Sequence, residues 1–273
     1  MLVLLMKGKR DKFLKKSKES VTEALKSRDM LLGSVTKSIE DLDKTINLLA
    51  ERLEDWYGIY FPELREVDKL KFSNAVLLID RENFDTKELS SLFGQNKATD
   101  LAKKSETSLG VKLPSADVAE CQSLAQSIVQ LGKLRDRFET YQKTLALELC
   151  PNLSEVGGPE VAAKLVSHVG SISKLALLPA SAIQVIGAEK ALFKHLKNKR
   201  IPPPKHGIIF QHARISASPK KVRGKIARTL ANKLSLAAKA DAFTKNQIGK
   251  GLHEDFDARY AEIMAQYKKQ KKK

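Results

Sequence analysis

Apolar residues recur at every third or fourth position along two long stretches of this chain. In the first stretch, from Ser20 to Gly58, one position of this apolar repeat is not apolar and holds Arg28. Ser20 and Glu23 fit a capping box, in which side chains satisfy the first free amides of a helix. The spacing is typical of a coiled-coil seam and predicts a single helix of about 60 Å. The seam positions are Val21, Leu25, Leu32, Val35, Ile39, Leu42, Ile46, Leu49, Leu53 and Trp56.

A second helix of similar length is predicted between Asp117 and Pro151, and Arg135 and Gln142 interrupt its apolar stripe. Two long amphipathic helices joined by a mixed segment most simply fold back as an antiparallel hairpin. Residues 63–113 would then form the tip of the hairpin, with short helices at 86–93 and 99–108.

The apolar residues of this tip have no obvious partner in a two-helix stalk, which predicts a homodimer formed through the tip or the stalk. The alternative is a folded cap that closes on itself. The residues that we expect at the dimer interface are Leu32, Ile39, Leu42, Leu49, Ile128 and Phe138.

After Gly157 the pattern changes to short helices broken by Gly and Pro, at 160–169, 171–178 and 180–186, which indicates a compact globule. A later helix is predicted to begin at Ser218, with Pro219 at its first position. One face of this helix is apolar and the opposite face is mainly cationic. The cationic face carries Lys221, Lys225, Arg228, Asn232 and Lys239.

These patterns predict an all-α fold: a long antiparallel coiled-coil hairpin followed by a compact helical domain. The predicted boundaries are a lead-in at 1–19, the hairpin with its tip at 20–156, the compact domain at 157–248 and a basic tail at 249–273.

The net charge of +17 is confined to the second part of the chain. Residues 1–157 hold 25 basic and 25 acidic residues, whereas residues 158–273 hold 24 basic and 7 acidic residues. A neutral part joined to a strongly basic part suggests two modules, the second of which meets a polyanion.

The two cysteines, Cys121 and Cys150, fall in one predicted helix and would be about 43 Å apart, too far for a disulfide. This favours a reducing compartment, and we expect a cytoplasmic protein. No apolar run approaches the roughly 20 residues that span a bilayer, so we expect no membrane association.

Signs of catalysis are weak. The chain has no glycine-rich nucleotide loop, no HExxH and no CxxC, and its five histidines lack the spacing of metal ligands. We therefore expect no catalytic residue, no bound metal and no cofactor.

The segment from Gly187 to His212 is the strongest candidate for function. A helix bearing Lys190 and Lys194 must end before three consecutive prolines, and Lys205 and His206 follow these prolines. Such a basic turn beside a basic helix favours phosphate binding. Only Phe193, Phe210 and Phe243 lie near it, and we expect at least two of them in the core, so recognition of a structured RNA by shape is favoured. His206 is the candidate to stack on an unpaired base.

The residues GAEKALF (187–193), PKHGIIF (204–210) and RGKIARTLANKLSLAAKADAF (223–243) resemble the Nop domain of the archaeal proteins that scaffold box C/D guide-RNA particles. The resemblance runs from about residue 20 to about residue 243. It implies an archaeal RNA-binding subunit with no enzymatic activity. The RNA-binding residues that it and the charge pattern indicate are Gly187, Ala188, Glu189, Lys190, Phe193, Lys194, Lys205, His206, Lys221, Lys225, Arg228 and Lys233.

The partners follow from the resemblance. Similar proteins dimerise through the coiled coil and bind kink-turn guide RNA together with a protein similar to ribosomal protein L7. They also recruit fibrillarin, which methylates the 2′-hydroxyl of a target RNA. Little sequence precedes Ser20, where the family carries its fibrillarin-holding domain, so we expect fibrillarin to be recruited only if such a domain is supplied.

Two alternatives stay open at this point. A spliceosomal relative shares the Nop domain, although the intact GAEKALF favours the guide-RNA branch. A purely structural coiled-coil adaptor would explain residues 20–150 but would leave the basic part without a role.

Overall fold

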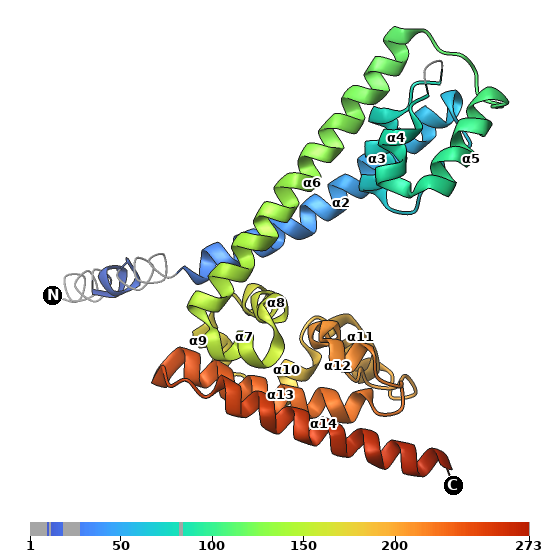
Figure 1. The fold of residues 1–273 in the computed structure, drawn as a ribbon. Helices are drawn as coiled ribbons and strands as arrows, with labels where there is room; N and C mark the ends of the chain where they lie inside the picture. The colour runs from blue at the N-terminus through green and yellow to red at the C-terminus, as the bar shows by residue number, and fades with distance from the viewer. Residues whose placement is uncertain (1–9, 11, 19–27, 82–83, 273) are drawn as a thin grey trace. The chain divides into compact units, whose positions relative to one another are not determined.

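The computed structural model describes residues 10, 12–18, 28–81 and 84–272, and it is built from helices (Figure 1). No strand occurs in these residues, which confirms the all-α prediction. The chain divides into two compact units, one of residues 1–37 and 140–273 and the other of residues 38–139. Ser20 and Glu23, the predicted capping box, lie outside the described residues. No helix in the described part is both long enough and apolar enough to cross a bilayer.

The two long helices are α2 (Asp29–Tyr60) and α6 (Ser115–Leu149). Their polar contacts show the antiparallel pairing within each unit. In the 38–139 unit, the guanidinium of Arg135 contacts the carboxylate of Asp43 at 2.8 Å. In the other unit, the amide of Gln142 donates to the hydroxyl of Thr36 at 2.8 Å. The two polar residues that interrupt the predicted seam are therefore partnered across the helix pair, which removes the penalty of burying them.

The tip segment closes on its own core. It forms α3 (Lys69–Leu78), α4 (Thr86–Phe93) and α5 (Gln95–Glu106). Phe61, Phe72 and Leu89 are fully or almost fully buried in one cluster with Tyr57 of α2 and Ile128 of α6. The apolar residues of the tip thus have partners in the three short helices and in α2 and α6, as in the alternative of a folded cap.

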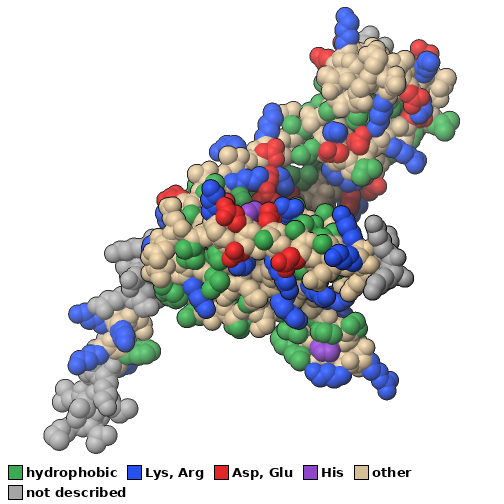
Figure 2. Space-filling view, turned by 60° about the horizontal axis from the view of Figure 1, so that its bottom comes forward, with side chains coloured by type: hydrophobic (Ala, Val, Ile, Leu, Met, Phe, Trp, Pro, Cys, Tyr) green, Lys and Arg blue, Asp and Glu red, His purple; other side chains and the backbone are tan. Residues whose placement is uncertain are grey.

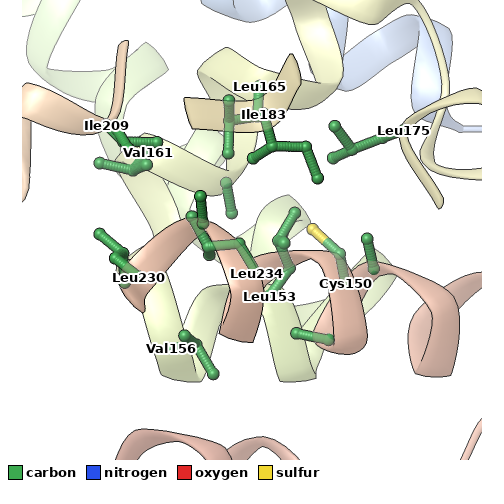
Figure 3. Packing of buried hydrophobic residues seen from close by; sticks show 14 of the residues in the cluster. Cys150, Leu153, Val156, Val161, Leu165, Leu175, Ile183, Ile209, Leu230 and Leu234 are labelled. Carbon is green, nitrogen blue, oxygen red and sulfur yellow. The ribbon is translucent and has the colours of Figure 1, made fainter. Parts of the chain in front are cut away.

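The other unit is a helical globule formed mainly by the second half of the chain. Its remaining elements are α7 (Pro151–Gly157), α8 (Pro159–Val169), α9 (Ile172–Leu177), α10 (Ala180–Val185), α11 (Glu189–Lys197), η1 (Ile208–Gln211), α12 (Ala213–Ser216), α13 (Arg223–Lys239), η2 (Ala240–Thr244) and α14 (Gly249–Lys272). Figure 3 shows apolar side chains from α7, α8, α9, α10 and α13 converging on the core. Leu234 of α13 is fully buried there.

The predicted boundaries differ from these units in two places. Residues 249–272, predicted as a tail, form α14, and Leu252, Phe256 and Ile263 bury its apolar side in the core of the globule. Residues 151–156, predicted as part of the hairpin, belong to α7, which packs against α13 and α14. Cys150 therefore follows α6 instead of lying within it. The prolines and glycines mark the helix ends, but they do not say which helices share a core.

A buried polar junction joins three of these helices. The carboxylate of Asp241, 2% exposed, accepts hydrogen bonds from the backbone N–H of Asn152 (3.1 Å) and of Leu153 (2.8 Å) at the start of α7. The side-chain oxygen of Asn152 accepts from the N–H groups of Ile248 and Gly249, both at 2.7 Å, at the start of α14. Each side chain satisfies amides that a helix N-terminus leaves free.

Candidate nucleic-acid interface

The turn after the three prolines is fixed to the segment that precedes α11. The N–H of Gly207 donates to the carbonyl of Gln184 at 3.0 Å, and the N–H of Ile208 donates to the carbonyl of Ile186 at 2.7 Å. A Cβ at position 207 would lie 1.8 Å from the carbonyl oxygen of Ile186. Only glycine lets the two backbones come this close, so the position of the turn is set by main-chain contacts.

The chain reverses its direction at Gly187, just before α11. Its φ of +83° is in the region that favours glycine, and a Cβ there would lie 2.7 Å from Ile208. The carboxylate of Glu189 accepts from the N–H of Gly187 at 2.7 Å and contacts the imidazole of His168 at 2.8 Å. Burial raises the pKa of Glu189, but the backbone hydrogen bonds and His168 outweigh it, so the net pKa is lowered. Glu189 therefore holds the reversal in place.

Lys205 connects the turn to α13. Its aliphatic stem lies over Gly224, with its Cδ 3.6 Å from the position of a Cβ there, and its carbonyl accepts from the amide of Gln184 at 2.7 Å. A shallow groove of about 350 Å³ results between the two segments. One side is lined by Gln184, Pro202, Pro203, Pro204 and Lys205, and the other by Lys221, Gly224, Lys225 and Arg228.

This groove is cationic, with no opposing charge. Lys205, Lys221, Lys225 and Arg228 are exposed, and none has an acidic partner among the described residues. Residues 190–240 contain no Asp or Glu at all. Four cations around one depression repel one another, and an anionic ligand would relieve that repulsion. We call the surface formed by these four residues and the three prolines the basic groove.

His206 lies beside the basic groove in an aromatic stack. Its ring is 4.5 Å from that of Phe210, at an interplanar angle of 16°, and the guanidinium of Arg223 lies 5.2 Å from the same Phe210 ring. Burial, with Arg223 and Lys205 nearby, lowers the pKa of His206. One face of the imidazole therefore already stacks within the protein. Arg223 also donates to the carbonyls of Ser216 (3.0 Å) and Ser218 (2.7 Å), which accounts for a cation on the apolar side of α13.

The helix α11 stands almost free of the core. None of its residues is buried; Lys190 and Lys194 are exposed, and Phe193 is 64% exposed. Phe243 is 59% exposed, so the expectation that two of the three nearby phenylalanines are core residues is wrong. In Figure 2 a projecting lobe combines Lys or Arg, His and hydrophobic side chains, with no acidic side chain in view on it. Lys190 and Lys194 do not line the basic groove.

Two further expectations differ from the structure. The ammonium of Lys233 is paired with Asp255 of α14 at 2.7 Å and is turned away from the basic groove. The helix α13 begins at Arg223, and the hydroxyl of Ser218 donates to the carbonyl of Arg214 instead of capping α13. Residues 218–222 form a turn, because the Ser218 hydroxyl is already engaged with the preceding helix.

The residues predicted for the dimer interface are buried or half-buried within the chain itself. Leu32, Ile39 and Ile128 are buried, whereas Leu42, Leu49 and Phe138 are half-buried. The exposed large apolar residues on α2 are Met30, Leu31, Leu48, Trp56 and Ile59, of which the last three belong to the 38–139 unit. Sequence periodicity identifies an apolar seam but does not tell whether the chain itself or a second copy covers it.

Gln184 and Gly224 were missed as parts of the site, and the three prolines were expected to end the helix but not to line a groove. Gly224 carried a signal, since a glycine inside a basic helix favours the close approach of another segment. No group of three or more His, Cys, Asp or Glu in the described residues could hold a metal ion.

Comparison with known proteins gives the same family from sequence and from fold. The model of the Nop family, described as "snoRNA binding domain, fibrillarin", matches residues 38–262. The chain is 39% identical to a NOP5 family protein of Methanocaldococcus jannaschii over 95% of its own length and 65% of the relative. It is 33% identical to nucleolar protein 58 of Botryotinia fuckeliana over 84% of its own length and 41% of that protein.

Among solved structures, the chain resembles one in the crystal structure of a fibrillarin/Nop5p complex. The TM-score is 0.55 and the identity is 29%, over 92% of this chain and 78% of the other. The chain thus spans about two thirds of one of these curated relatives and less than half of the other. Because the family model covers most of the chain, and the basic groove lies inside the matched region, this protein belongs to the Nop family.

Proposed function

We propose that this protein is a non-catalytic subunit of a box C/D ribonucleoprotein that guides 2′-O-methylation of RNA. It binds kink-turn RNA through the basic groove, together with a protein similar to ribosomal protein L7. The observation that carries the proposal is the contact of the Lys205 stem with Gly224, which brings a turn and a helix distant in sequence into one cationic surface.

The physical basis is phosphate neutralisation. Each of the four cations of the basic groove that meets an RNA phosphate releases condensed counterions, which makes binding favourable and salt-dependent. The proline turn is fixed by backbone hydrogen bonds, so little conformational entropy is lost when the RNA docks. A rigid groove of this kind suits the shape of a folded RNA.

The helix α11 is the surface that we assign to the L7-like protein and to the RNA next to it. Its exposed Phe193 and Leu196 offer apolar area, and Lys190 and Lys194 offer positive charge on the same helix. Aromatic and apolar anchors surrounded by charge are typical of protein interfaces. Methylation itself would be performed by fibrillarin, which the family description and the matching complex both name.

A gel-shift titration with kink-turn RNA, with and without an L7-like protein, tests this function. We expect weak, strongly salt-dependent binding to RNA alone and tighter binding to the RNA–protein complex. A duplex RNA of the same length without the kink is the matched control. Equal affinity for both RNAs in the presence of the L7-like protein would contradict the proposal.

We also propose that a second copy of the chain docks on α2 through Leu48, Trp56 and Ile59, which are 55%, 43% and 52% exposed. Sedimentation of the wild type and of Trp56→Ala tests this. The expected result is a dimer that weakens in the variant, with Val67→Ala as a control because Val67 is exposed elsewhere in the same unit. A monomeric wild type at all concentrations would contradict this interface.

A further inference from the structure

The outer face of α13 continues past the basic groove. Beyond Lys225 and Arg228, the residues Asn232, Leu236 and Lys239 follow at spacings of three or four and are all exposed. They therefore lie on the same side of the helix as the two cations of the groove. At a rise of about 1.5 Å per residue, Phe243 in η2 lies about 22 Å beyond Arg228.

This far end carries apolar surface that the protein leaves in water. Leu236 is 47% exposed, Phe243 at the end of η2 is 59% exposed, and Leu177 is 76% exposed. Leu177 belongs to α9, which packs against both α13 and η2. We call these three residues and Lys239 the distal patch. Exposed apolar side chains on elements that pack together are typical of a binding surface.

The charge around the distal patch is positive. Lys239 is exposed and has no acidic partner among the described residues. The carboxylate of Asp241 in η2 is buried and accepts hydrogen bonds at the start of α7. The carboxylate of Asp29, which lines a pocket with Ala242, accepts from the N–H of Ile172 at 3.0 Å at the start of α9. A partner at this patch therefore meets an aromatic ring and a free ammonium, and no negative charge faces it from η2 or α13.

We infer that the distal patch is a second RNA contact, in which an unpaired nucleobase stacks on Phe243 and the adjoining phosphate pairs with Lys239. This inference rests on the proposed function, because it extends the RNA path from the basic groove along the same helix face. Every nucleobase has a π-face, so a single exposed aromatic ring next to a cation binds single-stranded nucleic acid without sequence preference.

Charge and continuity favour RNA over a protein at this patch. A protein segment that covers Leu236 and Phe243 would have to place acidic groups beside Lys239 and Arg228, whereas an RNA strand places one phosphate per nucleotide along the whole stripe. The strand that leaves the groove also reaches the patch without a change of direction, since both lie on one helix face.

The test compares two RNAs with the chain of 273 residues: a kink-turn RNA, and the same RNA with a single-stranded extension of about eight nucleotides that carries 2-aminopurine. Wild type should bind the extended RNA more tightly and quench the 2-aminopurine by stacking. Phe243→Leu should remove the extra affinity, about ten-fold, and the quenching, whereas Phe243→Tyr should keep both. Tyr141→Ala, which changes an exposed aromatic residue on α6, is the matched control.

The outcomes separate the two proposals. If Phe243→Leu binds both RNAs as the wild type does, or if the extension adds nothing to wild-type affinity, the distal patch is not an RNA contact. The same titrations are repeated with the L7-like protein present. If Phe243→Leu then loses only the binding of that protein, the patch is a protein interface and the inference is overturned. Loss of kink-turn specificity in the wild type itself would contradict the proposed function, irrespective of Phe243.

Discussion

Two polar regions of the same unit differ in how their charges are used. At the junction of α7, η2 and α14, the Asp241 carboxylate and the Asn152 amide have protein partners and are almost completely buried. In the basic groove, four cations are exposed and have no acidic partner among the described residues. The first arrangement stabilises the fold, and the second leaves interaction energy available for a ligand.

The largest effect is expected from Asp241→Ala. Removing the carboxylate leaves the N–H groups of Asn152 and Leu153 buried without partners, which should lower the free energy of unfolding by about 3–5 kcal/mol. Urea unfolding followed by circular dichroism should show the loss. The fluorescence of Trp56, the single tryptophan, reports the other unit and should change far less. Asp255→Ala is the control, and an equal shift in both variants would mean that the junction is unimportant.

The triple variant Lys221→Gln, Lys225→Gln, Arg228→Gln should lose RNA affinity and keep its stability, the opposite of Asp241→Ala. With three phosphate contacts removed, affinity for kink-turn RNA should fall on the order of a hundred-fold at about 0.1 M salt. The slope of log affinity against log salt should decrease by about 2.7. The urea midpoint should stay at the wild-type value, because these side chains are exposed. An unchanged salt slope would remove α13 from the RNA interface.

His206 is half-buried, unlike the buried Asp241 and the exposed cations of the basic groove, and its contribution to stability should depend on pH. Its pKa is lowered below its ordinary value of 6.5 in the folded state, so the unfolded state binds more protons as the pH falls below that value. Stability should therefore fall between about pH 7 and pH 5, where the unfolded imidazole is protonated first. Thermal unfolding of wild type and of His206→Gln checks this. If the variant loses as much stability on acidification as the wild type, other groups such as His212 account for the effect.

The smallest effect is expected from Lys233→Gln. Its ion pair with Asp255 involves a carboxylate side chain that is 66% exposed, so its loss should lower stability by less than about 1 kcal/mol. RNA affinity should stay within about two-fold of wild type, since Lys233 does not line the basic groove. An anisotropy titration beside Lys225→Gln provides the comparison. Equal losses of affinity in the two variants would show that the RNA surface extends across α13 to α14.

Much of the architecture could be predicted because helix signals are local. The three-four spacing in α2 and α6, the prolines that end helices and the run without acidic residues at 190–240 are all properties of neighbouring positions. They indicated two long helices, a compact basic domain and a cationic turn. The cap formed by α3, α4 and α5 was only the alternative to self-association, because short helices with mixed patterns show no clear apolar face before they pack.

The sequence by itself determined the helical class, the position of the positive charge and the segments that could bind RNA. Only the tertiary structure decided which charges stay free. Glu189 and Lys233 look like binding residues in the sequence. In the fold, Glu189 contacts His168 and Lys233 forms an ion pair with Asp255. Asp241 looks like one acidic residue in a basic helix, yet it caps α7, which lies 89 positions away in the chain. A pairing of this kind depends on contacts between distant segments, and no local pattern encodes it.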